Sequence, residues 1–108
     1  MRNTVRCAAA VLVLLAASGA QAAGNTEAGR VKANTCMGCH GIPGYNNVYP
    51  TYRVPKIGGQ SADYLGAALR AYKSGERPHK TMQGQAMSLS DQDIDDIAAY
   101  IAAAPARK

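Results

Sequence analysis

The sequence contains no phenylalanine and no tryptophan, and all six of its aromatic residues are tyrosines. Such a chain has few bulky apolar side chains with which to fill a core. The apolar run near the N-terminus, CAAAVLVLLAA, has 11 residues, whereas a helix needs about 20 to cross a bilayer. These shortages argue against a membrane-spanning segment and indicate that a large bound group contributes to the core.

The first 22 residues have the organisation of a secretory signal peptide. A basic start, MRNTVR, precedes the apolar run, and Ala20-Gln21-Ala22 fits the small-residue rule for cleavage. We therefore expect residues 1–22 to be removed on export and residues 23–108 to form one domain in the periplasm. Cys7 then belongs to the removed segment.

Charge is mild in total but uneven along the chain. Residues 23–108 hold ten basic and seven acidic side chains, a net charge of +3 that does not suggest nucleic-acid binding. Residues 53–80 carry six basic and two acidic side chains. We expect this basic segment to form a docking surface, because opposite charges steer transient encounters between proteins.

Apolar periodicity and capping signals predict an all-α domain with three main helices. The first runs from about Thr26 to Cys39, and Gly29 lies where a close helix contact could need it. The second starts after the N-cap Ser61 and stops at Gly75. No segment has the pattern of a strand pair.

The third helix has the clearest start signal. Ser90 is the predicted N-cap, and Leu89 can pack against Ile94 as a hydrophobic staple. An apolar stripe and a cluster of aspartates follow it. The stripe comprises Ile94, Ile97, Ala98 and Ile101, and the cluster comprises Asp91, Asp93, Asp95 and Asp96. The cluster lacks the glycine turn and terminal Glu of a calcium loop, so we expect a solvated helix start.

The segment Cys36-Met37-Gly38-Cys39-His40 allows four chemistries. A disulfide would leave His40 unexplained, and a thioredoxin-like dithiol belongs to an α/β domain. Zinc needs four ligands, and His79 is the only other histidine. Covalent haem uses every residue, because C-x-x-C-H is its attachment signature. Cys36 and Cys39 would form thioethers, and His40 would be the proximal iron ligand.

Three stretches of this chain resemble class I c-type cytochromes, in particular the small monohaem type similar to cytochrome c-553 or to one domain of cytochrome c4. They are EAGRVKANTCMGCHG, VPKIGGQSADYLGAALRAYKSGERPH and TMQGQAMSLSDQDIDDIAAYIAA. The resemblance implies three main helices around one haem c, with the Pro55 carbonyl accepting from His40 and a contact between Gly29 and Tyr100. The loop GIPGYNNVYPTYR departs from the family by its length and its tyrosines.

The sixth iron ligand has three candidates. Met82 lies in an expected loop eight residues before Ser90, where the family's ligand lies. Met87 has the ordinary interpretation of a hydrophobe packed on the last helix, and His79 that of a surface residue in a polar turn. A Met opposite His would raise the reduction potential. The resemblance therefore favours His40 and Met82 as the metal ligands.

Two further groups of residues are expected beside the haem. Tyr45, Tyr49 and Tyr52 would cover its propionate side, because a tyrosine can bury its ring while its hydroxyl meets a carboxylate. Gly58 and Gly59 would permit close approach of the backbone to the macrocycle.

The sequence thus predicts a periplasmic one-electron carrier with covalent haem c, and not an enzyme. Its expected partners are redox proteins: a membrane quinol-oxidising complex, a terminal oxidase or a periplasmic dehydrogenase. We expect a monomer without nucleic-acid binding or stable membrane insertion. The alternatives are a permanent haem subunit of an oxidoreductase complex, and a haem peroxidase or ligand sensor with an open iron.

Overall fold

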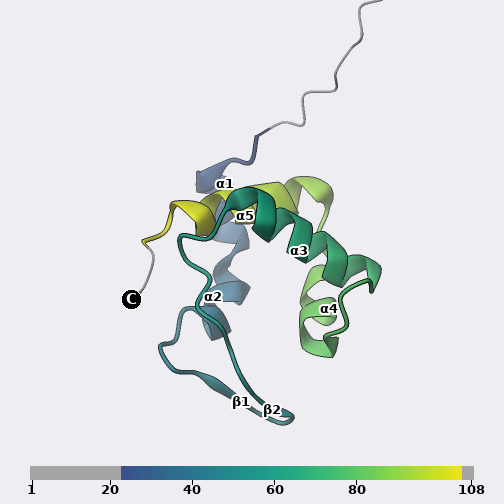
Figure 1. Cartoon of the computed structure of the whole chain (residues 1–108). Coiled ribbons are helices and arrows are strands. Elements are labelled where there is room, and N and C mark those ends of the chain that lie inside the picture. Colours follow the sequence, from purple (N-terminus) through teal and green to yellow (C-terminus); the bar gives the residue numbers. More distant parts are fainter. Residues whose placement is uncertain (1–22, 106–108) are drawn as a thin grey trace, which may run out of the picture.

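The computed structural model describes residues 23–105, so the predicted signal peptide lies outside the described residues (Figure 1). This part of the chain contains five helices and one two-stranded antiparallel sheet. The elements are α1 (Thr26–Lys32), α2 (Asn34–His40), β1 (Asn46–Val48), β2 (Thr51–Arg53), α3 (Ala62–Ser74), α4 (Lys80–Ala86) and α5 (Asp91–Ala103). In Figure 1, α1, α3 and α5 lie together at the top, and α2, the hairpin and α4 lie below them.

The core is formed mainly by α3 and α5, and its side chains are all aliphatic. The buried apolar residues are Ala33, Leu65, Leu69, Ala86, Ile94, Ile97, Ala98 and Ile101. The predicted stripe of α5 is therefore confirmed, and α5 packs against both α1 and α3. Cys36, Met37, Met82 and Tyr72 pack against the edge of this cluster. No tyrosine is fully buried in the described residues.

Local capping signals fix the starts of the two long helices. Ser61 accepts a hydrogen bond from the Tyr64 amide, and Ser90 forms a capping box with Asp93. Gly75 ends α3 with φ of 85°, a left-handed conformation that favours glycine. These three predictions are confirmed.

Three predictions of local structure are wrong. The first helix is interrupted at Ala33, which separates α1 from α2. The loop after His40 contains the β1–β2 hairpin, so a strand pair is present in an otherwise helical domain. Met82 lies within α4 and not in a flexible loop.

The crossing of α1 and α5 is so close that it admits no side chain at Gly29. A Cβ atom added there would lie 2.0 Å from the Asp96 carbonyl oxygen and 2.7 Å from the Tyr100 Cβ. The contact between Gly29 and Tyr100 that the family resemblance implies is therefore present. A Cβ atom added at Gly24 would likewise lie only 1.9 Å from the Asp95 carbonyl oxygen.

We expect Gly29→Ala to destabilise the protein by about 3 kcal/mol, because the backbone of α5 would have to shift. Gly66→Ala is the matched control, since Gly66 is also a buried helical glycine. A Cβ at Gly66 would meet the end of the flexible Arg70 side chain at 3.0 Å. The control should have an unchanged free energy of unfolding or gain up to about 1 kcal/mol, because Ala has a higher helix propensity than Gly. Thermal unfolding of both variants tests this, and equal losses would contradict it.

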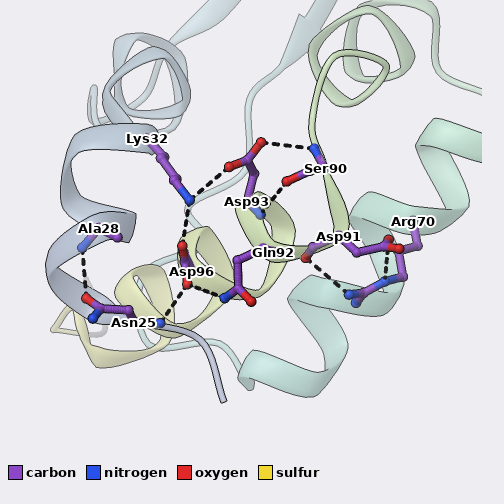
Figure 2. Close-up of polar contacts among 9 residues, drawn as sticks. All are labelled: Asn25, Ala28, Lys32, Arg70, Ser90, Asp91, Gln92, Asp93 and Asp96. Carbon is purple, nitrogen blue, oxygen red and sulfur yellow. Dashed lines mark hydrogen bonds and ion pairs between the residues drawn. The ribbon is translucent and has the colours of Figure 1, made fainter. Parts of the chain in front are cut away.

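The aspartates of α5 form a structured network, which corrects the expectation of a solvated cluster (Figure 2). Asp96 is only 3% exposed. Its carboxylate accepts hydrogen bonds from the Asn25 amide at 2.7 Å, from Lys32 at 2.6 Å and from Gln92 at 2.8 Å. Lys32 also pairs with Asp93 at 2.8 Å. The network ties the start of α1 to α5.

This network predicts a loss of stability in acid. Hydrogen bonds led by that from the Asn25 amide lower the pKa of Asp96 from 3.8 to about 2. Because the folded pKa lies below the unfolded one, the stabilisation is present above about pH 4 and is lost as the pH falls through about 2. Asp96→Asn should lower Tm by several degrees at pH 7, and its difference from the parent protein should shrink below pH 4.

Glu27→Gln serves as the control for the acid series. Glu27 also pairs with a cation, Arg30, but both side chains of that pair are more than half exposed, and exposed pairs contribute little. The Tm of Glu27→Gln should equal that of the parent protein at every pH. A constant difference between Asp96→Asn and the parent protein from pH 7 to pH 2 would contradict the linkage.

Candidate functional site

The two thiols of the C-x-x-C-H motif lie on α2, and α1 is the only element with which α2 packs among those described. Cys36 and Cys39 form no disulfide with each other. Cys36 is half-buried against the edge of the core, and this burial raises the pKa of its thiol. Cys39 is exposed one helical turn later. The spacing places both thiols on one side of a short helix.

His40 ends α2, and its imidazole is held in a defined orientation. Its Nδ1 lies 2.7 Å from the Pro55 carbonyl oxygen, the contact that the family resemblance implies. A carbonyl oxygen can only accept, so Nδ1 carries the proton and Nε2 keeps a free lone pair. Such an imidazole is suited to bind a metal through Nε2.

Helix α4, which carries the candidate ligand Met82, begins at Lys80 after the N-cap His79. The Nδ1 atom of His79 accepts a hydrogen bond from the Met82 amide at 3.3 Å, so this histidine caps the helix. His79 is half-buried and not a surface residue of a polar turn. Its ring packs edge-on against two tyrosine rings, with 4.9 Å between ring centroids for Tyr52 and 6.0 Å for Tyr72.

The two candidate methionines differ in burial. Met82 is half-buried and packs against the core cluster that Cys36 also contacts. Met87 is 65% exposed, so its expected packing on the last helix is wrong. Met82 is therefore the better-placed thioether of the two.

The two glycines after Pro55 make close contacts with the C-terminal part of the described chain, and their approach to the macrocycle stays a prediction. A Cβ at Gly58 would lie 3.0 Å from the Pro105 carbonyl oxygen, so the close approach is to the C-terminal end of the described chain. Gly59 has φ of 77°, which favours glycine, and its amide donates to the Ile101 carbonyl. The loop with both glycines therefore packs against the end of α5 and the residues that follow it.

The donor set fits a haem better than the other groups considered. Two thiols and an imidazole lie on α2, and a thioether lies on α4. Cys36 and Met82 both pack against the edge of the same core cluster, so a large group bound at this edge could reach both helices. Within residues 23–105, no three His, Cys, Asp or Glu side chains come together as a metal site.

Two arginines of the basic segment, residues 53–80, contact other side chains of the fold. Arg70 pairs with Asp95 at 2.7 Å and with Asp91 at 3.5 Å. Arg77 donates to the Tyr64 hydroxyl and lies over the Tyr72 ring. Of the six basic side chains between 53 and 80, Arg70 is therefore the one that these ion pairs join to carboxylates of α5.

In the same described part of the chain, no helix is long and apolar enough to cross a membrane.

Comparison with known proteins gives consistent matches. A family described as Cytochrome c matches residues 26–105. Cytochrome c-554(548) of Halomonas halodenitrificans is 44% identical over 81 residues, which cover 72% of this chain and 94% of that protein. Cytochrome c4 of Pseudomonas aeruginosa is 45% identical over 83 residues, which cover 77% of this chain and 40% of that protein.

A solved structure agrees with these sequence matches. The crystal structure of reduced recombinant cytochrome c4 from Pseudomonas stutzeri superposes with a TM-score of 0.59 and 26% identity. The match covers 77% of this chain and 52% of that one. The chain thus spans nearly all of cytochrome c-554(548) but about half or less of the cytochromes c4.

Proposed function

The chain belongs to the cytochrome c family, with the class I fold and one covalent haem c, and we propose that it is a periplasmic carrier of single electrons. When bound, the haem iron supplies the one-electron couple. The observation that carries the proposal is the contact between His40 and Pro55 at the end of the C-x-x-C-H helix. It sets the tautomer that a proximal iron ligand requires.

Each residue of the site has a separate role in this proposal. Cys36 and Cys39 would anchor the macrocycle to α2, and His40 would bind the iron. Met82 would supply the second iron ligand, from a helix that His79 caps. With both ligands in place, the iron would change oxidation state without a change of ligands, and no position would remain for a substrate. We therefore expect an electron carrier and not an enzyme.

The optical spectrum of the protein matured in the periplasm tests this function. We expect a low-spin spectrum in both oxidation states, with the weak near-infrared band of sulfur-to-iron charge transfer in the oxidised form. Added carbon monoxide should leave the reduced spectrum unchanged. A high-spin reduced form that binds carbon monoxide at once would favour the ligand sensor or peroxidase instead.

The choice between a free carrier and a permanent subunit needs a separate measurement. A free carrier should elute from a size-exclusion column at the mass of one domain when native periplasmic extract is applied. Elution of all its haem absorbance with a larger protein would favour the subunit of an oxidoreductase complex.

A further inference from the structure

The tip of the β1–β2 hairpin exposes two large apolar side chains next to each other. Val48 is 85% exposed and Tyr49 is 93% exposed, more than any other large hydrophobic residue of residues 23–105. Single exposed hydrophobic residues are ordinary, but an adjacent pair at a projecting turn resembles the apolar centre of a protein interface. We propose that this tip docks on an acidic redox protein, an inference that rests on the proposed carrier function.

The tip is held in shape by its own side chains. The side-chain Nδ2 atom of Asn47 donates to the backbone carbonyl oxygens of Tyr49 at 3.2 Å and Pro50 at 3.1 Å. The Thr51 hydroxyl donates to the Val48 carbonyl oxygen at 3.1 Å. A contact that is already ordered loses little conformational entropy on binding. The backbone of the turn that carries Tyr49 is therefore ordered before a partner binds.

The inner face of the hairpin connects the tip to the candidate haem site. Asn47 and Tyr52 are opposite each other in the sheet, and both are half-buried. The Tyr52 ring lies 4.9 Å from that of His79, which caps the helix of Met82. The hairpin lies on the same side of the molecule as α2 and α4 (Figure 1). A partner on the tip would thus be brought close to the redox centre.

The charges on this side select an acidic partner. Residues 28–62 and 77–90 contain no aspartate or glutamate. They include α2, the hairpin and α4, whereas every carboxylate belongs to or borders α1, α3 or α5. Arg53 on the hairpin and Lys80 on α4 form no ion pair with a described residue. Such a surface attracts a partner rimmed by carboxylates.

Reduction by flavodoxin hydroquinone tests the proposal, because flavodoxin is an acidic redox protein with an exposed apolar flavin edge. One electron passes from the hydroquinone, leaving the semiquinone, to the ferric cytochrome. In stopped-flow mixing, Val48→Ser with Tyr49→Ser should lower the second-order rate constant about tenfold, as loss of an interface anchor does. Arg53→Gln should lower it at low salt and flatten its salt dependence.

Val31→Ser is the matched control. Val31 is an apolar residue of α1 with 66% exposure, and it lies outside the hairpin. Its rate constant should equal that of the parent protein. Reduction by free lumiflavin semiquinone should be the same for all variants, since this small neutral reagent needs no docking surface. If lumiflavin semiquinone does not reduce the parent protein, the proposed carrier function is wrong, and this result is independent of the role of the hairpin tip.

Three outcomes would overturn the docking proposal. The first is an equal flavodoxin rate for the tip variant and the control. The second is sedimentation with phosphatidylglycerol vesicles that depends on Val48 and Tyr49, which would make the tip a membrane contact. The third is a dimer in analytical ultracentrifugation that the tip variant abolishes, which would make a second copy the occupant.

Discussion

Cys36→Ala combined with Cys39→Ala is expected to remove covalent haem and to abolish the cooperative thermal unfolding transition. The reason lies in the core, which within residues 23–105 contains eight buried apolar residues and no buried aromatic one. In domains below about 70–80 residues a single core rarely supplies more than about 3–5 kcal/mol, and this domain is only slightly longer. Circular dichroism at 222 nm and the haem absorbance of the purified protein measure both effects.

The control for this experiment is Gly38→Ala, between the two cysteines. Gly38 is exposed, and a Cβ there would have no neighbour within 4 Å. This variant should keep its haem and its unfolding transition. A cooperative helix transition in the haem-free double variant would show that the protein core suffices without the cofactor.

Met82→Ala should lower the reduction potential and remove the near-infrared sulfur-to-iron band. A thioether favours the reduced iron, so its loss should shift the potential by a substantial part of the roughly 0.8 V that axial ligation spans. The variant should also gain a site for carbon monoxide. Potentiometric titration and the oxidised near-infrared spectrum measure these changes.

Two comparison variants make the assignment of Met82 specific. Met87→Ala should keep the band and change stability by no more than about 0.5 kcal/mol, because Met87 is 65% exposed. His79→Ala should also keep the band if Met82 is the ligand, because the Nδ1 atom of His79 caps α4. Loss of the band in Met87→Ala with survival in Met82→Ala would reverse the assignment.

Features encoded by neighbouring residues could be predicted from the sequence. The starts of α3 and α5 followed from the caps Ser61 and Ser90, and the end of α3 followed from Gly75. The C-x-x-C-H motif is equally local and indicated haem without any knowledge of the fold. In each of these cases the physical cause lies within a few residues.

Short elements and distant contacts could not be predicted in this way. Each strand of the hairpin has three residues, and Pro50 lies in its turn, so neither strand shows a usable alternation. Helix α4 has seven residues, too few for apolar periodicity, and its cap is a histidine instead of Ser, Thr, Asp or Asn. Pro78, before that cap, is the one local signal that marks its start.

The burial of Asp96 shows the same limit for a single side chain. In the sequence it is one of several aspartates near the start of a helix, and such residues are usually solvated. Its partners Asn25 and Lys32 lie 71 and 64 positions away along the chain. Only the packing of α1 on α5 distinguishes Asp96 from its exposed neighbour Asp91.

The pairing of α1 with α5 also determines the order in which folding and haem attachment can occur. The bond between Asn25 and Asp96 joins residues 71 positions apart, and the fold cannot close before α5 has been synthesised. Among the described helices and strands, α2 packs on α1 alone, and its residues Cys36 and Met37 also contact the edge of the core. The thiols of α2 thus leave the ribosome before the residues of α5 that complete the core. Haem attachment can therefore precede closure of the fold.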